Sequence, residues 1–308
     1  MTGTLTTLRG GTRASALARW QTARVAAALR ERAGCACEEI LIATEGDRRL
    51  EQPLPEIGGK GLFTEALETA LRRGAIDFAV HSLKDLPIET PVGLALAAVW
   101  QRIDPRDVVI ARSRTPLDRL PAGAVVGTSS TRREAQLRAR RPDLTVRSLR
   151  GNVDTRVRKG LAGDYDAIVI AAAGVERLGL ANAITEYLPL DVMLPAPGQG
   201  ALAVQCRADD GDTRALLARL DDPIARATTG AERAFLAALG GGCAAPIAAF
   251  GSASPESSPA LTLTGLVIAR DGTRAVRVQG RAPLDDSLGL AERLAQEALA
   301  RGARELLP

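Results

Sequence analysis

Strand-like and helix-like segments alternate through the first two thirds of the chain, and this alternation restricts the fold more than any other feature. Short apolar runs at 78–82, 94–100 and 167–171 are typical of buried strands, whereas 131–140 and 153–162 favour helices. Strands that alternate with helices in this way build parallel α/β sheets. We therefore expect an α/β fold with two doubly wound domains.

Further elements complete this pattern. Strands are predicted near 6–9, 39–44, 108–111, 124–127 and 144–148, and helices near 14–33 and 62–73. The segment 194–200 (LPAPGQG) interrupts the alternation, and one more strand follows it at 201–207. We expect this late strand to pair back into the first sheet, which gives two crossings between the domains and a hinged cleft.

The last third of the chain differs and predicts a small α+β domain. Its expected elements are a helix at 223–239, a glycine loop at 240–242, two strands at 261–269 and 274–279 joined by a turn at 271–272, and a helix at 286–301. The expected domains are 1–103 with 200–220, then 104–199, then 221–308.

Positively charged side chains stand near the start of four predicted helices, behind turns rich in glycine or hydroxyl groups. These are Arg13, Lys60, the pair Arg132 and Arg133, and Arg156. A helix N-terminus has unpaired N–H groups and a partial positive charge, which disfavour cations and attract anions. A single such arginine is usually a solvated surface charge, but four together favour a site for a strongly negative ligand. The segments 12–13, 82–85, 128–133 and 150–156 fall just after predicted strands, so their side chains can converge on one side of their sheets.

The overall composition agrees with an acidic ligand. The 308 residues carry a net charge of +4 and a pI of about 9.1, whereas DNA-binding proteins usually have longer basic runs. Aromatic residues are 3% of the chain, too few for base-stacking surfaces. The basic run at 132–141 keeps a nucleic-acid-binding face open as an alternative.

The sequence also restricts location and metal chemistry. It shows neither the apolar core of a signal peptide nor a membrane span, so we expect a cytoplasmic protein with reduced cysteines. Its single histidine, His81, argues against most zinc sites and against a Ser–His–Asp triad. We expect no metal, and we expect His81 to be a packed residue.

Two positions are candidates for chemistry. Lys84 and Asp85 follow an apolar strand and precede Pro87, where a cation and a carboxylate can act as a pair. The alternative is an ordinary surface turn. Cys243 follows three glycines in a loop, where its thiol can project freely and serve for covalent attachment. Cys206, on an alternating strand, is expected to be an inert core residue.

The motifs together resemble one known family, porphobilinogen deaminase or hydroxymethylbilane synthase, over nearly the whole chain. The matching stretches are 12–15 (TRAS), 58–63 (GGKGLF), 80–87 (VHSLKDLP), 104–107 (DPRD), 126–133 (VGTSSTRR), 149–153 (LRGNV), 171–174 (AAAG), 198–201 (GQGA) and 241–243 with Pro246. Each stretch is weak evidence alone, but their common order is specific.

The resemblance implies a fold of two hinged α/β lobes, like those of two-lobe ligand-binding proteins, with a third α+β domain. It also implies a transferase of haem biosynthesis that carries a dipyrromethane cofactor on Cys243 through a thioether. Four porphobilinogen molecules would condense on this primer with loss of ammonia, and hydroxymethylbilane would be released. We expect porphobilinogen as the substrate, a monomer, and neither a nucleic-acid nor a membrane partner.

The resemblance also assigns roles to residues. Asp85 matches the catalytic aspartate. The residues expected to bind the cofactor are Cys243, Lys84, Asp85, Ser130, Arg132, Arg133, Arg150 and Arg156. Those expected to bind the substrate are Arg13, Ser15, Lys60, Ser129, Arg177 and Gln199. Arginine suits this role because the acetate and propionate groups of porphobilinogen make the growing chain a polycarboxylate.

Some positions depart from the family pattern. Glu56 and Glu65 replace residues that are often basic, which weakens the case for substrate contacts on that flank. Ala244 and Ala245 replace bulkier residues and put the packing around the cofactor in doubt. A solute-binding or sensor module with the same two lobes remains an alternative, and it would need neither Asp85 nor Cys243.

Overall fold

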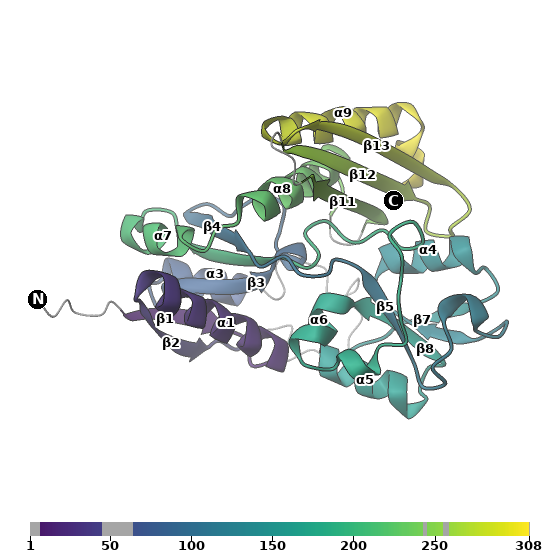
Figure 1. Cartoon of the computed structure of the whole chain (residues 1–308), viewed down its shortest axis with the longest axis horizontal. Coiled ribbons are helices and arrows are strands. Elements are labelled where there is room, and N and C mark those ends of the chain that lie inside the picture. Colours follow the sequence, from purple (N-terminus) through teal and green to yellow (C-terminus); the bar gives the residue numbers. More distant parts are fainter. Residues whose placement is uncertain (1–6, 45–63, 243–244, 255–258, 308) are drawn as a thin grey trace, which may run out of the picture. The chain divides into compact units, whose positions relative to one another are not determined.

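The computed structural model describes residues 7–44, 64–242, 245–254 and 259–307 (Figure 1). Its contacts divide the chain into two compact units. The first unit is Met1–Arg102 with Ala201–Arg226, and the second is Ile103–Gly200 with Ala227–Pro308.

The first unit is built on a five-stranded sheet in the order β2-β1-β3-β10-β4. The strands are β1 (Thr7–Thr12), β2 (Ala36–Leu41), β3 (Phe78–Ser82), β4 (Leu94–Trp100) and β10 (Leu202–Arg207). The helices are α1 (Ala16–Ala33), α3 (Glu65–Arg72), the short η1 (Leu83–Asp85), α7 (Gly211–Ala218) and the first residues of α8 (Pro223–Ala238).

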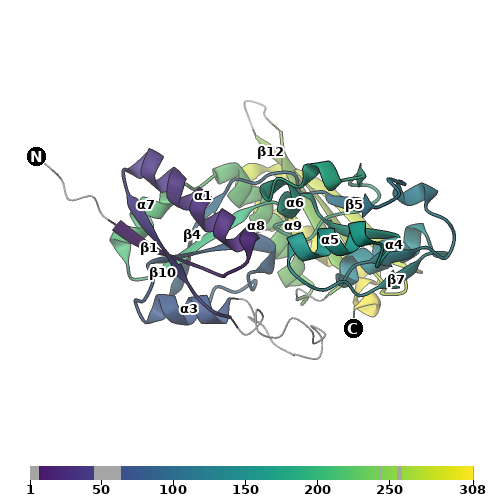
Figure 2. The same cartoon turned by 90° about the horizontal axis from the view of Figure 1, so that it is seen from below.

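Helices cover both faces of this sheet. Leu29 of α1 and Leu217 of α7 pack with Phe78 on one face, and Leu67 of α3 packs with Ala79 on the other. Figure 2 shows α1 and α3 on opposite sides of β1 and β10. The two faces follow from the alternation of side chains along each strand.

The late strand β10 pairs back into the first sheet, which confirms that expectation, but its direction corrects the prediction of a parallel sheet. It is antiparallel to both β3 and β4, and its first residue, Leu202, lies beside Trp100, the last residue of β4. The chain leaves the first unit just after β4 and returns just before β10. A strand that starts where its neighbour ends must run in the opposite direction.

The second unit contains another five-stranded sheet, in the order β7-β6-β8-β5-β9. The strands are β5 (Asp107–Ala111), β6 (Val125–Gly127), β7 (Thr145–Arg147), β8 (Ala167–Ala171) and β9 (Glu186–Tyr187). The helices are η2 (Leu117–Arg119), α4 (Thr131–Arg140), α5 (Val153–Ala162), α6 (Ala172–Arg177) and η3 (Ala181–Ala183). Leu137 of α4 packs on one face and Val157 of α5 on the other. β5 runs antiparallel to β8 and β9, so this sheet is also mixed.

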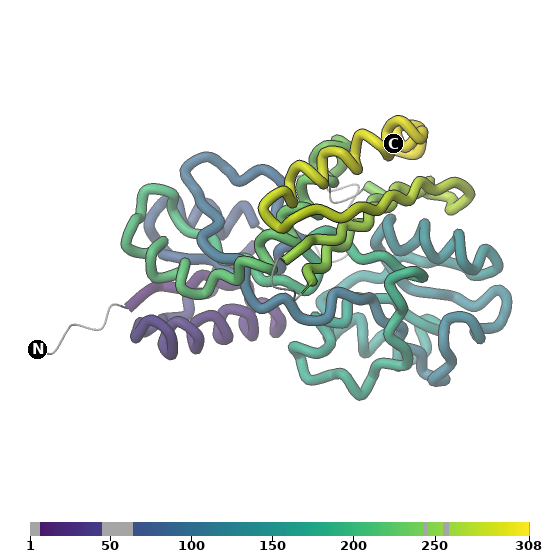
Figure 3. The backbone as a smooth tube through the Cα atoms, turned by 45° about the horizontal axis from the view of Figure 1, so that its top comes forward, coloured from purple at the N-terminus to yellow at the C-terminus, as the bar shows by residue number. Residues whose placement is uncertain are grey.

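The second unit also holds a three-stranded antiparallel sheet near the C-terminus, in the order β11-β12-β13. Its elements are β11 (Ile247–Ala253), β12 (Ala260–Ile268), β13 (Ala275–Pro283), η4 (Leu284–Asp286), α9 (Ser287–Ala300) and η5 (Ala303–Leu306). Figure 3 shows α9 running along the hairpin of β12 and β13. Phe235 of α8 lies against Gly265, where a Cβ would come within 2.3 Å of its ring. The opposite face carries Leu266, which packs with Ala135 of α4.

Most predicted elements are confirmed, and five of them have the predicted bounds: β3, β4, α4, α5 and β8. β2 begins three residues earlier than predicted, because Gly34 ends α1 in the left-handed conformation and lets the strand start at Ala36. The expected strands over 261–269 and 274–279 are present, but β11 was not predicted. Its sequence, IAAFGSA, has only one β-branched residue, and its pairing with β12 makes it a strand. None of the helices in the described ranges is long and apolar enough to cross a membrane.

We expect Glu232→Gln to reduce the stability of the second unit. Glu232 is fully buried, and its two carboxylate oxygens accept hydrogen bonds of 2.7 Å from the N–H groups of Gly198 and Gly251. A glutamine has one acceptor oxygen, so its NH₂ group would face an N–H group. We predict a loss of about 1–3 kcal/mol in the free energy of unfolding, measured by denaturant titration. Glu292→Gln, an exposed change on α9, is the control, and equal stability of the two variants would contradict the prediction.

Candidate functional site

In the first unit, the predicted site residues gather at the carboxyl end of two neighbouring parallel strands. Arg13 directly follows β1, and Lys84 and Asp85 lie in η1, which directly follows β3. The register of Gly11 beside Ala79 in β1 and β3 places these groups at one edge of the sheet. This confirms the expected convergence for the first unit.

Asp85 is held by buried neighbours while its own side chain stays exposed. Leu83 is fully buried, and its N–H donates a 3.0 Å hydrogen bond to the carbonyl of Ala201. Leu86 is buried on the other side. These two buried leucines therefore hold the backbone on both sides of Lys84 and Asp85. The Asp85 carboxylate stays accessible, and Lys84 is half-buried beside it.

Ser15 begins the helix that follows Arg13. Its hydroxyl accepts a 3.3 Å hydrogen bond from the N–H of Ala18, which makes it the N-cap of α1. Because this bond sets where α1 starts, Ser15 also fixes the turn that carries Arg13. Its predicted contact with substrate stays a prediction.

In the second unit, Arg132 and Arg133 lie in the first turn of α4 and are almost completely buried, with exposed fractions of 4% and 5%. Ser130 is the N-cap, and its hydroxyl accepts a 3.4 Å hydrogen bond from the N–H of Arg133. Two buried guanidinium groups at a helix N-terminus are unfavourable unless anions compensate them.

Asp107, at the start of β5, supplies one such anion. Its Oδ1 accepts hydrogen bonds from Nε and Nη2 of Arg133 at 3.1 and 2.7 Å, and its Oδ2 lies 2.8 Å from Nη1 of Arg132. Burial would raise the pKa of Asp107, but the charges of Arg132 and Arg133 lower it well below its usual range. Asp107 lies in the DPRD stretch, but no role was predicted for it; the signal in the sequence is a carboxylate at the start of an apolar strand.

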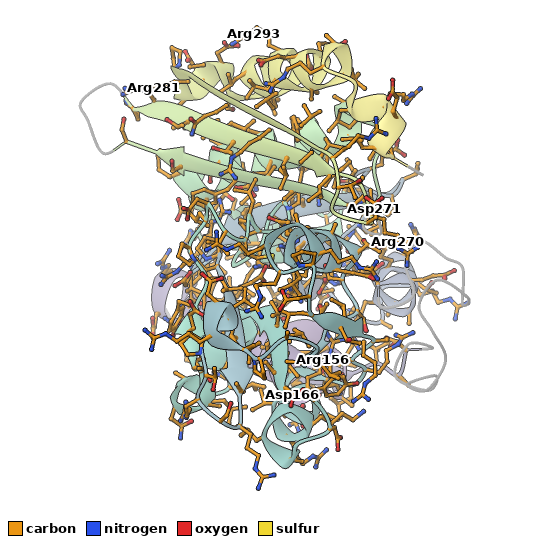
Figure 4. All side chains as sticks on the ribbon, turned by 90° about the vertical axis from the view of Figure 1, so that its right-hand side faces the viewer. Arg156, Asp166, Arg270, Asp271, Arg281 and Arg293 are labelled. Atoms are coloured by element: carbon orange, nitrogen blue, oxygen red, sulfur yellow. The ribbon has the colours of Figure 1, made fainter. Side chains whose placement is uncertain are left out.

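Further predicted residues follow the neighbouring parallel strands β6 and β7: Ser129 after β6, and Arg150 and Arg156 after β7. The hydroxyl of Ser129 donates to the carbonyl of Leu149 at 2.7 Å and accepts from its N–H at 3.0 Å. Arg150 is half-buried, and burial lowers its pKa. Nε of Arg156 donates a 2.7 Å hydrogen bond to the carbonyl of Gly151. Figure 4 shows Arg156 on its helix α5.

Arg177 and Gln199 contact the backbone of the second unit. Nη2 of Arg177 donates a 2.7 Å hydrogen bond to the carbonyl of Gly200, and burial lowers the pKa of Arg177 to about 10. Gln199 is fully buried, and its amide nitrogen donates to the carbonyl of Pro105 at 2.7 Å and to Oδ1 of Asp107 at 2.9 Å. Both side chains thus bind backbone carbonyls of this unit, and their contact with a ligand stays a prediction.

Several expected positions lie outside the described residues: Lys60, Cys243, Glu56 and Ala244. Glu65 is described and is exposed in the first turn of α3. The described residues nevertheless give each unit a cationic strand edge, and the first unit adds an accessible carboxylate. Such an arrangement can bind a ligand with several carboxylates and stabilise or move a positive charge beside Asp85.

His81 of β3 generates a pH prediction. It is buried, and its burial and the nearby charge of Arg13 lower its pKa to about 4, although the side chain of Gln205 opposes this shift. The unfolded chain would have a histidine pKa of about 6.5. The folded state therefore favours the neutral imidazole, and its contribution to stability is complete above pH 6.5 and decreases as the pH falls towards 4.

We expect this decrease to reach about 3 kcal/mol, and we expect His81→Gln to lack it. Denaturant titrations of both proteins across this pH range would measure it. The carboxylates titrate in both proteins, so they cancel in the difference. An identical pH dependence of the two unfolding free energies would contradict the prediction.

Comparison with known proteins agrees with these features. A family model described as porphobilinogen deaminase, dipyromethane cofactor binding domain, matches residues 8–215, and one described as porphobilinogen deaminase, C-terminal domain, matches 227–300. The porphobilinogen deaminase of Roseiflexus sp. (strain RS-1) is 51% identical over 98% of this chain and 98% of its own length. That of Brevibacillus brevis is 47% identical over 96% of this chain and 95% of its own.

Solved structures give a more distant similarity. The VFT2 domain of BvgS from Bordetella pertussis has a TM-score of 0.42 and 17% identity, over 70% of this chain and 86% of that domain. The family models and the relatives cover nearly the whole sequence. The chain belongs to the porphobilinogen deaminase family, enzymes of tetrapyrrole biosynthesis with a dipyrromethane cofactor.

Proposed function

We propose that this chain is a transferase that condenses four porphobilinogen molecules, with loss of ammonia, and releases hydroxymethylbilane. The observation that carries the proposal is the accessible Asp85 carboxylate at the same sheet edge as Arg13. A condensing enzyme needs cations for the carboxylates of the substrate and an anion for the cation that forms when ammonia leaves. Both charges are present at this edge.

The arginines would hold the carboxylates of the substrate and of the growing chain. Arg13 in the first unit and Arg132, Arg133, Arg150 and Arg156 in the second are proposed for this role, with Lys84, Ser15, Ser129 and Ser130 as helpers. Lys60, Arg177 and Gln199 stay in the proposal on the resemblance alone. Each charge-assisted hydrogen bond contributes about 1.5–3 kcal/mol, so several are needed to keep an intermediate bound through successive additions.

The residues present fit a dipyrromethane cofactor, because two buried arginines at one sheet edge exceed the charge of the single Asp107 beside them. Bound by a thioether to Cys243, the cofactor would supply the free pyrrole carbon that starts the chain. Lys84, Asp85, Ser130, Arg132, Arg133, Arg150 and Arg156 would hold it. The arginines would neutralise its carboxylates, and Asp85 would accept hydrogen bonds from its N–H groups.

Asp85 would act in two ways. Loss of ammonia from the aminomethyl group of porphobilinogen leaves a cation whose charge extends to the pyrrole N–H, and a carboxylate near that N–H stabilises it. The free ring carbon at the end of the growing chain would attack this cation and form the new carbon–carbon bond. That ring carbon must then lose its proton. The same carboxylate can accept this proton as a general base.

We expect Asp85→Asn to fold normally but to lose nearly all turnover. A neutral amide can neither stabilise the cation well nor accept the departing proton. Steady-state formation of the tetrapyrrole measures this. Glu89→Gln, an exposed change four residues away, is the matched control. Near-normal turnover of Asp85→Asn would rule out the catalytic role of Asp85.

The other cysteines are poor candidates for the attachment point. Burial raises the pKa of Cys37 to about 12 and that of Cys206 to about 11, so both thiols remain neutral near neutral pH. A neutral thiol is a weak nucleophile. This leaves Cys243 and the buried Cys35, and the glycine loop favours Cys243.

We expect incubation with porphobilinogen to add to the chain the mass of two porphobilinogen molecules less two ammonia molecules, on Cys243. Intact mass and peptide mapping would locate the adduct. Cys243→Ser should lack it, and Cys37→Ser should keep it. If the wild-type chain forms no adduct, the proposed function fails.

We also propose a monomeric, cytoplasmic enzyme with the domains 1–103 plus 200–220, 104–199 and 221–308. Support comes from the order of the predicted elements and from the family resemblance. Light scattering of the purified protein would test the monomer, and limited proteolysis would test the boundaries.

A further inference from the structure

Arg132 and Arg133 share one counterion, and this determines which of their nitrogen atoms remain available. In the described part of the chain, Arg133 uses Nε and Nη2 on Asp107. Arg132 uses Nη1 on Asp107 and, at 2.7 Å, on the carbonyl of Leu194. The two arginines therefore present different edges away from the carboxylate.

The edge that remains on Arg132 is formed by Nε and Nη2, and such an edge can bind a carboxylate in a bidentate way. Its Nε is buried and has no hydrogen-bond partner among the described residues, and Nη2 beside it takes part in none of the bonds described above. A buried guanidinium N–H without a partner is costly. Because the Nε–Nη2 edge matches the spacing of two carboxylate oxygens, a ligand carboxylate would satisfy both donors at once.

The charge of the cluster leads to the same conclusion. Within the described ranges, Arg132 and Arg133 carry two positive charges and their counterion Asp107 one negative charge, so these three residues together keep one positive charge. A buried net charge is unfavourable unless an anion compensates it. A carboxylate on the Nε–Nη2 edge of Arg132 would complete the compensation.

Asp107 itself is firmly positioned. It is the first residue of β5, where it pairs with Ala171 of β8, and its Oδ1 also accepts from the amide of Gln199 at 2.9 Å. Gln136 donates to the carbonyl of Leu194 at 3.0 Å, and so holds the second partner of Arg132 as well. Both partners of Arg132 Nη1 are therefore fixed by the fold rather than by the arginine.

We propose that Asp107 is a positioning residue that turns the Nε–Nη2 edge of Arg132 towards a carboxylate of the tetrapyrrole chain or its primer. This inference rests on the proposed function, and it adds a residue and an atomic contact to it. Asp107 does not touch the ligand; it acts through Arg132.

The experiment compares Asp107→Glu, Asp107→Asn and Arg132→Lys in the full chain. Asp107→Glu keeps the charge but moves the carboxylate by one methylene, and Arg132→Lys keeps the charge but removes the fork. Asp118→Asn is the matched control, because Asp118 makes an exposed ion pair with Arg140 at the other end of α4. For each protein we would measure Tm and the porphobilinogen concentration that gives half-maximal adduct formation, by intact mass.

We expect this concentration to rise about tenfold or more in the three variants and to stay unchanged in Asp118→Asn. Adding Asp107→Asn to Arg132→Lys should raise it less than twofold further, because Asp107 acts through an arginine that is already absent. Asp107→Asn leaves two buried cations without a counterion and can fail to fold, in which case Asp107→Glu decides.

A lower Tm with an unchanged half-maximal concentration in Asp107→Glu would mean a structural role only and would overturn the inference. An unchanged value in Arg132→Lys would overturn it too. If the wild-type chain forms no adduct, the proposed function fails instead. If the wild-type chain forms the adduct and the variants have an unchanged half-maximal concentration, only the role of Asp107 is rejected.

Discussion

Side chains from three elements bind the backbone of one irregular segment, 194–200, and the second unit depends on these hydrogen bonds. Gln136 of α4 bonds both the N–H and the carbonyl of Leu194, Glu232 of α8 accepts from Gly198, and Arg177 of α6 donates to Gly200. The segment has no strand or helix bonds of its own. Its buried polar groups therefore need these side chains, since an unpaired buried group is costly.

The same segment connects the two sheets of the second unit. The carbonyl of Pro195 accepts from Ala249 of β11, while Leu194 packs with Ala135 of α4 and with Leu266 of β12. This segment also meets the arginine cluster, because Gln199 donates a hydrogen bond to Asp107 and Arg132 forms an ion pair with it. Stability and the proposed ligand recognition thus share one network of hydrogen bonds and ion pairs in this unit. Such networks lose much of their value when a single member is left unsatisfied.

The strand directions explain where the charged residues lie. Arg13 and Asp85 follow parallel strands, so the sequence pattern alone was enough to place them at one sheet edge. Asp107 reaches the edge occupied by Arg132 and Arg133 only because β5 runs antiparallel to β8 and begins beside its last residue. Since the direction of a strand depends on how the chain returns to the sheet, the pairing of Asp107 with the arginines could not be predicted from local patterns.

The sequence by itself determined the type and order of most elements, the cations near the starts of α1, α4 and α5, and the family to which the motifs belong. These features depend on local preferences and on short-range spacing, which a sequence carries directly. Only the tertiary structure decided that Arg132 and Arg133 are buried around Asp107, that Gln199 bonds the backbone, and that both large sheets are mixed. Each of these depends on contacts between residues distant in the chain, and burial then determines which charges need a partner and which donors remain for a ligand.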